Sequence, residues 1–228
     1  MQITQGKPGG RDPMAADSGT SKEAVVLAHG LWTNARVLMF QRRWLASLGL
    51  AVTAISYPSW SQGLAENAGR LAKFVAATPG ESVHIVAHSL GGLVALKLLA
   101  DEREPRLRRV VLMGTPCAGS HCASVALATP GIALLVGQTY RDWCRLPPVT
   151  LPAGVEIGVI AGNLALGLGR LFPGLKAPND GMIRVEETRL EAAKDRIELP
   201  VCHTGMLVSR ACTRQVACFL RTGRFAHG

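Results

Sequence analysis

Short apolar runs that alternate with stretches of helical length constrain the fold of this chain most strongly. Runs rich in β-branched residues lie at 24–29, 51–56, 82–88, 109–113, 155–161 and 196–199. Helical patterns lie mostly between them, at 36–48, 64–77, 90–101 and 209–220. Continuous apolar strands alternating with helices are typical of a parallel sheet that is covered on both faces. We therefore predict an α/β protein with a mostly parallel, twisted sheet of about six strands.

Length and composition fit one domain preceded by a polar tail. A chain of 228 residues can bury a substantial core. Hydrophobic residues make up 48% and charged residues 18% of it, which excludes overall disorder. Residues 1–22 are rich in Gly, Pro, Ser and charge and contain no apolar stretch of the kind found in secretory signals. We predict a flexible tail over 1–22 and one domain over 23–228.

The formal net charge of +9 points to no particular partner. The densest basic group, formed by Arg103, Arg106, Arg108 and Arg109, falls on a predicted helix-to-strand loop, and no nucleic-acid-binding motif accompanies it. The longest apolar candidate for a membrane span, 123–136, is interrupted at 129–131. We predict no nucleic-acid partner and no stable membrane insertion, and the oligomeric state is left open.

The six cysteines do not have the spacing of a metal site. Cys117 and Cys122 flank His121 but lack a second pair of ligands, so no metal is predicted. Without a secretory signal, an even number of cysteines is better read as reduced thiols than as disulfides. We therefore expect a cytoplasmic protein.

The clearest chemical signal is the sequence Ala87-His88-Ser89-Leu90-Gly91, where a predicted strand gives way to a helix. A nucleophile on such a turn has a strained backbone and an exposed oxygen, and the residues two before and two after it must be small. Ala87 and Gly91 meet this requirement. The helix N-terminus also favours developing negative charge. We predict that Ser89 is a catalytic nucleophile.

A serine nucleophile needs a base to take its proton. Five of the six histidines lie in a strand, in an insertion, beside glycine turns or near the C-terminus: His29, His84, His88, His121 and His227. His203 alone follows the final predicted strand and precedes the last helix. We predict that His203 is the base.

The base needs an acid that orients it. Asp180 lies in a turn-forming sequence, Pro178-Asn179-Asp180-Gly181, after the penultimate strand. It gives the chain order Ser, Asp, His that a nucleophile elbow of this kind requires. We predict that Asp180 is the acid, with Asp195, Glu186 and Glu187 as alternatives.

Ester or amide chemistry also needs amide donors for the oxyanion. One donor is expected to be the amide of Leu90, directly after the nucleophile. The other should come from the loop after the first strand, His29-Gly30-Leu31-Trp32, where Leu31 is the first choice and Trp32 the alternative.

Together these motifs resemble small bacterial lipases and esterases of the α/β-hydrolase superfamily. The resemblance spans essentially 24–222 and includes 29–31, 87–92, Gly114-Thr115-Pro116 with Gly119-Ser120, 179–181 and 203–204. It implies hydrolysis of small-molecule or lipid acyl esters through an acyl-enzyme, without a metal or cofactor. Such lipases often have a histidine where this chain has Cys117. The superfamily also contains thioesterases and acyltransferases, which remain alternatives, as does a catalytically inactive binding protein.

One long apolar insertion, 117–150, separates the fourth and fifth predicted strands. It is either an extra packed helix pair or a cap over the site. We predict a helical cap or lid and expect four residues to contact substrate: Trp32, Cys117, Leu134 and Leu135.

Overall fold

The computed structural model describes residues 23–101, 104–146 and 150–227. The predicted tail over 1–22, Arg103 and residues 147–149 of the predicted cap lie outside the described residues. Within the described ranges the chain forms six strands: β1 (Glu23–Ala28), β2 (Ala51–Ile55), β3 (Ser82–His88), β4 (Leu107–Met113), β5 (Glu156–Gly162) and β6 (Asp195–Leu199). They form one sheet in the order β2-β1-β3-β4-β5-β6, and every neighbouring pair is parallel. The predicted parallel sheet is confirmed.

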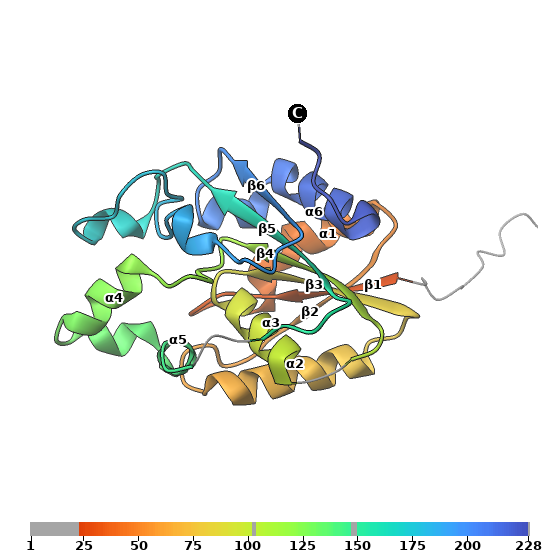
Figure 1. Cartoon of the computed structure of the whole chain (residues 1–228), viewed down its shortest axis with the longest axis horizontal. Coiled ribbons are helices and arrows are strands. Elements are labelled where there is room, and N and C mark those ends of the chain that lie inside the picture. Colours follow the sequence, from red (N-terminus) through yellow and green to blue (C-terminus); the bar gives the residue numbers. More distant parts are fainter. Residues whose placement is uncertain (1–22, 102–103, 147–149, 228) are drawn as a thin grey trace, which may run out of the picture.

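Helices cover both faces of this sheet. The α-helices are α1 (Met39–Ser47), α2 (Leu64–Ala77), α3 (Leu90–Asp101), α4 (His121–Ala128), α5 (Gln138–Trp143) and α6 (Arg210–Thr222). Short 3-10 helices are η1 (Ala35–Leu38), η2 (Ile132–Val136), η3 (Leu168–Leu171), η4 (Glu186–Thr188) and η5 (Thr204–Val208). Figure 1 shows α1 and α6 on one side of the sheet and α2 and α3 on the other.

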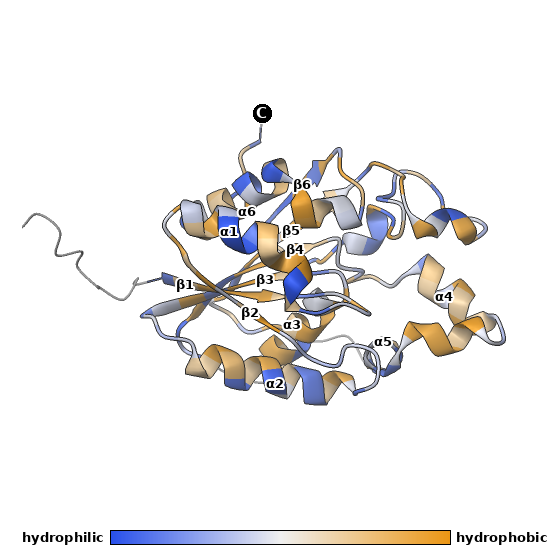
Figure 2. Ribbon diagram, turned by 180° about the vertical axis from the view of Figure 1, so that it is seen from behind, coloured by the Kyte–Doolittle hydropathy of each residue, from blue (hydrophilic) through white to orange (hydrophobic). Residues whose placement is uncertain are grey.

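The strands are apolar throughout because both of their faces are buried. Val25 and Leu27 of β1 pack into the layer with α1 and α6, whereas Val26 packs into the layer with α2 and α3. Successive side chains of a strand point to opposite faces, so each strand supplies both cores. The hydrophobic colouring of the strands and of the inner helix faces follows from this arrangement (Figure 2).

The topology brings the loops after β1 and β3 to one place. From β1 the chain moves to β2 on one side, and β3 then pairs with the other side of β1, so the strand order reverses between β1 and β3. Ligands of open parallel sheets bind beyond the carboxyl ends of the strands at such a reversal. Ser89 follows β3 directly, and the loops after β5 and β6 carry Asp180 and His203 at the same edge.

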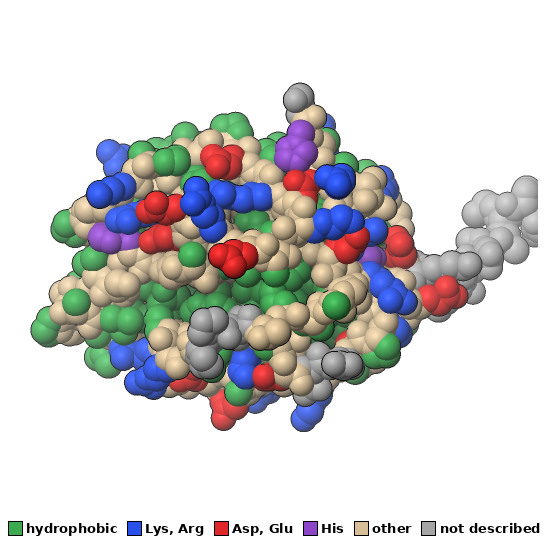
Figure 3. Space-filling model, viewed as in Figure 1, with side chains coloured by type: hydrophobic (Ala, Val, Ile, Leu, Met, Phe, Trp, Pro, Cys, Tyr) green, Lys and Arg blue, Asp and Glu red, His purple; other side chains and the backbone are tan. Residues whose placement is uncertain are grey.

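The basic residues near β4 are used within the fold. Arg108 and Arg109 lie in β4 and not in the predicted loop. The Arg106 guanidinium donates to carbonyl oxygens at the end of α2, including that of Thr78 at 2.9 Å. Arg109 pairs with Glu156 at 2.7 Å. On the face seen in Figure 3, Lys and Arg side chains alternate with Asp and Glu, in keeping with the absence of a single basic tract from the sequence.

Two further features concern membranes and thiols. In the part of the chain that the structure describes, no helix has both the length and the hydropathy that a bilayer crossing needs.

All six cysteines are free thiols that form no disulfide. The cellular compartment stays a prediction.

Candidate active site

Ser89 occupies a sharp turn between β3 and α3. Its φ angle is 54°, which a residue with a side chain rarely adopts. The Ser89 amide donates to the Met113 carbonyl at 2.9 Å, and the Ser89 carbonyl accepts the Gly92 amide at 3.0 Å. These bonds fix the strained turn at the carboxyl edge of the sheet.

Glycine is required on the helical side of the turn because α3 lies directly against the strands. A Cβ at Gly91 would lie 2.5 Å from the His29 carbonyl oxygen and 2.8 Å from that of Ala28. A Cβ at Gly92 would overlap the side chain of Thr115. The two glycines therefore allow the first turn of α3 to approach the loops after β1 and β4.

Three predicted catalytic side chains lie in contact. His203 Nε2 is 3.0 Å from Ser89 Oγ, and His203 Nδ1 is 2.7 Å from Asp180 Oδ2. A carboxylate only accepts, so Nδ1 carries the ring proton and Nε2 is left to accept from the serine hydroxyl. The His203 amide also donates to the Asp180 carbonyl at 2.8 Å, which joins the two loops.

The two oxygens of the Asp180 carboxylate have different partners. Oδ1 accepts the amides of Met182 at 3.0 Å and Ile183 at 2.7 Å. Oδ2 remains for His203. Gly181, with φ 89°, makes the turn that folds these amides back onto the carboxylate. The turn thus fixes the side-chain rotamer of a fully buried acid.

Gly114, at the end of β4, leaves space for this pair. Its φ angle is 58°, and a Cβ there would lie 3.1 Å from His203 Nδ1 and 3.2 Å from Asp180 Oδ2. The Gly-Thr-Pro motif was visible in the sequence, but this close approach depends on the tertiary structure.

The alternative acids have other partners. Glu187 accepts the amides of His121 at 2.5 Å and Arg184 at 2.8 Å. Glu186 pairs with the Arg184 guanidinium, and Asp195 contacts the C-terminal segment near His227. Among the described residues, none of these three carboxylates forms a hydrogen bond or ion pair with His203.

The loop after β1 lies against the nucleophile turn. A Cβ at Gly30 would lie 3.1 Å from Ser89 Cβ, so the backbone that carries Leu31 passes beside Ser89. Neither the Leu31 amide nor the Leu90 amide has an acceptor within the described residues. Trp32 also adopts a positive φ, 57°, and its side chain is exposed.

Two buried aromatic residues hold this loop, a role that the sequence did not reveal. Tyr57 donates its hydroxyl to the His29 carbonyl at 2.5 Å and its amide to His29 Nε2 at 3.2 Å. Since Nε2 accepts, Nδ1 carries the proton and donates to the Gly30 carbonyl at 2.8 Å. The rings stack with centroids 4.2 Å apart. Burial lowers the pKa of His29, which keeps this arrangement neutral.

The predicted substrate residues fall into different environments. Leu134 and Leu135 are 70% and 51% exposed, and Trp32 is also exposed. Cys117 is half-buried and packs against the core beneath α2 and α3. Burial raises the pKa of its thiol to about 12, so the thiol is neutral at physiological pH.

The insertion between β4 and β5 has a fixed part and an exposed part. Helix α5 is bound to the start of α2, because Asp142 accepts the Leu64 amide at 3.0 Å and Thr139 donates to the Gln62 carbonyl at 2.8 Å. The segment 131–137 contains η2 and begins and ends with glycines of positive φ. A Cβ at the second of these would lie 3.1 Å from the Leu31 side chain. The exposed part therefore lies beside the loop after β1.

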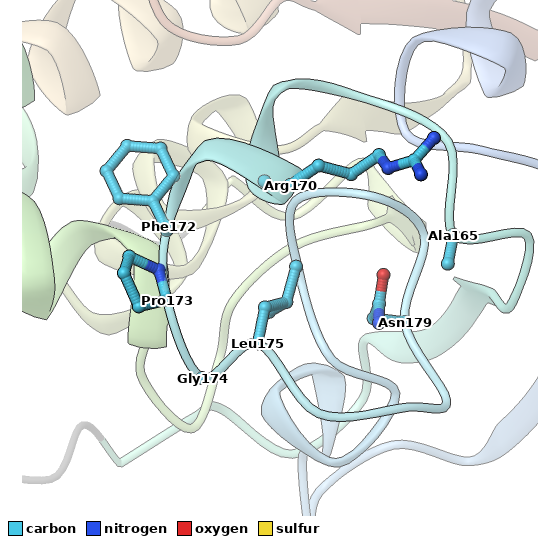
Figure 4. Close-up of a pocket in the computed structure, with 8 residues that line it drawn as sticks. Ala165, Arg170, Phe172, Pro173, Gly174, Leu175 and Asn179 are labelled. Atoms are coloured by element: carbon cyan, nitrogen blue, oxygen red, sulfur yellow. The ribbon is translucent and has the colours of Figure 1, made fainter.

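A pocket of about 530 Å³ lies beside Asn179, the residue that precedes Asp180 (Figure 4). It is lined by Ala165, Gly169, Arg170, Phe172, Pro173, Gly174, Leu175 and Asn179. None of Ser89, His203 and Asp180 lines it. No motif in the sequence predicted this pocket.

We expect the protein to lose stability in mild acid, because three of its histidines are buried and have lowered pKa values. Burial lowers the pKa of His29 and His84, and that of His88 to about 3. Below pH 6.5 the unfolded chain binds protons that the native state excludes, so stability is complete above that pH and falls toward pH 3. His88 alone is expected to cost about 2 kcal/mol at pH 5. Urea unfolding at pH 7.5 and pH 5 measures this, and an unchanged free energy of unfolding would contradict it.

A six-stranded parallel sheet with a serine turn after its third strand, and an acid and a histidine after its fifth and sixth, is the architecture of the α/β-hydrolase fold. The sequence profile of the alpha/beta hydrolase family matches residues 25–215. The chain therefore belongs to this family.

Solved structures agree with this fold. The mature form of lipase BlEst2 from Bacillus licheniformis is similar with a TM-score of 0.68 and 19% identity, over 88% of this chain and 91% of that one. The metagenomic carboxyl esterase MGS0156 is similar with a TM-score of 0.64 and 21% identity, over 81% of this chain and 65% of that one. Polyneuridine aldehyde esterase is similar with a TM-score of 0.56 and 17% identity, over 90% of this chain and 100% of that one. No curated protein matches the sequence.

Proposed function

We propose that the chain is a serine hydrolase that cleaves carboxylic esters, with Ser89 as nucleophile, His203 as base and Asp180 as the acid that orients it. One observation carries this proposal: the continuous contact from Ser89 Oγ through His203 to Asp180 Oδ2, at 3.0 and 2.7 Å. Membership of the alpha/beta hydrolase family supports the reaction type.

Acylation follows from the direction of these contacts. His203 Nε2 takes the hydroxyl proton while Ser89 Oγ bonds to the ester carbonyl carbon, whose π electrons move to the oxygen. Asp180 stabilises the imidazolium through Nδ1–H. The amides of Leu31 and Leu90, which have no acceptor in the described part of the chain, supply the donors for the oxyanion. When the intermediate collapses, the C–O bond to the leaving alcohol breaks and His203 returns the proton to it.

In deacylation, water takes the place of the serine hydroxyl as the nucleophile, and the same steps follow. His203 removes a proton from water as the water oxygen bonds to the acyl carbon. Collapse of the second intermediate breaks the bond to Ser89 Oγ, which takes from His203 the proton that came from water, and the carboxylic acid is released. Apart from the ester and water, every group that acts in this proposed cycle is a side chain or an amide of this chain.

The distribution of exposed apolar side chains supports an ester with an apolar acyl group. Ten exposed large hydrophobic residues lie on segments that follow the carboxyl ends of strands: Trp32, Trp60, Ile132, Leu134, Leu135, Leu164, Leu166, Leu168, Leu171 and Val208. Leu48, in contrast, lies at the opposite edge, just before β2. A concentration of exposed apolar surface is typical of a site that binds apolar ligands.

Hydrolysis of p-nitrophenyl esters from acetate to laurate tests the proposal, together with a matched thioester. We expect all esters to be cleaved and the longer ones to have higher kcat/KM. Faster cleavage of the thioester would favour a thioesterase. The absence of turnover with every substrate would favour an inactive binding protein and would overturn the proposal.

The exposed part of the insertion is expected to set acyl-chain selectivity. Each methylene buried against it contributes about 0.8 kcal/mol. We therefore expect Leu134→Ala and Leu135→Ala to lower kcat/KM for laurate by about tenfold and to leave acetate nearly unchanged. Leu48→Ala is the matched control, since it removes an exposed leucine at the opposite edge. An equal loss for all chain lengths would show that the segment is structural.

A further inference from the structure

A buried histidine that has no role in the proposed reaction lies next to Ser89 and against His203. His88 is the last residue of β3 and precedes Ser89. Its Nε2 atom lies 3.0 Å from the carbonyl oxygen of His203, and the two rings have centroids 4.7 Å apart. On its other side, a Cβ at Gly30 would lie 3.3 Å from His88 Nδ1. The ring therefore lies between the loop after β1 and the loop that carries the base.

The contact with His203 fixes the protonation of the His88 ring. A carbonyl oxygen only accepts, so His88 Nε2 carries a proton and donates it. Burial, and to a smaller extent the neighbouring His203, lowers the pKa of His88 to about 3. The ring is then neutral at working pH, and no second positive charge opposes the imidazolium that forms on His203 during the reaction.

We infer that His88 is a positioning residue: its Nε2–H···O bond to His203 holds the backbone of the base so that the imidazole reaches Ser89 and Asp180 at once. The loop after β6 is otherwise joined to the acid loop by the His203 amide. The His88 bond ties the same residue to the strand that carries the nucleophile. This inference rests on the proposed hydrolase function.

A second histidine on the same strand provides a matched control. His84 lies four residues earlier in β3, on the same face, and is also buried, with a lowered pKa. Neither of its ring nitrogens has a hydrogen-bond partner among the described residues. His84 therefore has the burial of His88 without a bond to the base.

The experiment compares His88→Leu, His88→Gln and His84→Leu in the whole chain. We expect His88→Leu to lower kcat for a p-nitrophenyl ester by about 10- to 100-fold with little change in KM, because small displacements of a reacting group have effects of this size. His88→Gln keeps an N–H donor and should recover most of the loss. His84→Leu should retain wild-type kcat.

A spectroscopic readout separates positioning from stability. The proton between His203 Nδ1 and Asp180 should give a downfield ¹H resonance in the wild type. We expect it to shift or broaden in His88→Leu and to persist in His84→Leu and His88→Gln.

Several outcomes would overturn the inference while ester hydrolysis by the wild type stands. These are wild-type kcat in folded His88→Leu, an equal loss in His84→Leu, or no recovery in folded His88→Gln. If both His88→Leu and His88→Met fail to fold while His84→Leu folds, His88 serves stability alone and the inference is wrong. A wild type that cleaves no ester would instead overturn the proposed function.

Discussion

Replacing Ser89 with alanine is expected to lower kcat for ester hydrolysis by about 10⁴- to 10⁶-fold. The reason is that Ser89 Oγ is the only protein atom proposed to bond to the acyl carbon, and alanine leaves the base with nothing to activate except water. Initial rates with a p-nitrophenyl ester measure the effect. KM and the melting temperature should change little, because the hydroxyl hydrogen-bonds to His203 alone among the described residues.

Ser82→Ala is the control for this substitution. Ser82 begins the strand that Ser89 follows, far from the carboxyl edge, and should retain wild-type kcat. Near-wild-type activity in Ser89→Ala would remove the nucleophile from the proposed mechanism.

Replacing Asp180 with asparagine is expected to lower kcat by about 10⁴-fold. The amide group fits the same space, and its oxygen can still accept the amides of Met182 and Ile183 at the Oδ1 position. Its nitrogen then faces His203 Nδ1 as a donor. This favours the tautomer with the proton on Nε2, which cannot accept from Ser89.

The other carboxylates are the controls for the acid. Glu186→Gln and Asp195→Asn should keep wild-type kcat, because these carboxylates bind Arg184 and His227, respectively. If either variant were inactive while Asp180→Asn remained active, the acid would be misassigned.

Much of the fold was predictable because its signals are local. The strand at 82–88 and the helix at 64–77 have the predicted bounds, since turn residues and apolar periodicity coincide at both ends. The helix predicted over 36–48 is instead a 3-10 turn followed by α1. Asn34 accepts the Arg36 amide and so stabilises a tighter first turn.

The contact among Ser89, His203 and Asp180 was also predictable, because a parallel sheet brings the ends of all its strands to one edge. The supporting residues were not. His29, Tyr57, His88 and Gly114 contribute through contacts between segments distant in sequence, which a single chain does not encode locally. The bond from the His121 amide to Glu187 also joins segments that are distant in sequence.

The structure of the insertion between β4 and β5 was also only partly predictable from the sequence. Its apolar composition indicated an unusual segment, but composition does not distinguish a side chain that packs from one that stays exposed. Helix α5 docks on α2 through Asp142 and Thr139, whereas Leu134 and Leu135 remain exposed. Whether the exposed part moves as a lid stays a prediction.

Covalent labelling with a fluorophosphonate tests the proposed nucleophile most directly. The reagent bonds to an activated serine oxygen and releases fluoride, and intact mass with peptide mapping locates the label. We expect one equivalent on Ser89 in the wild type and none in Ser89→Ala, with slow labelling in His203→Ala because the base is missing. A label on another residue, or no label on an enzyme that hydrolyses esters, would contradict the assignment of Ser89 as the nucleophile.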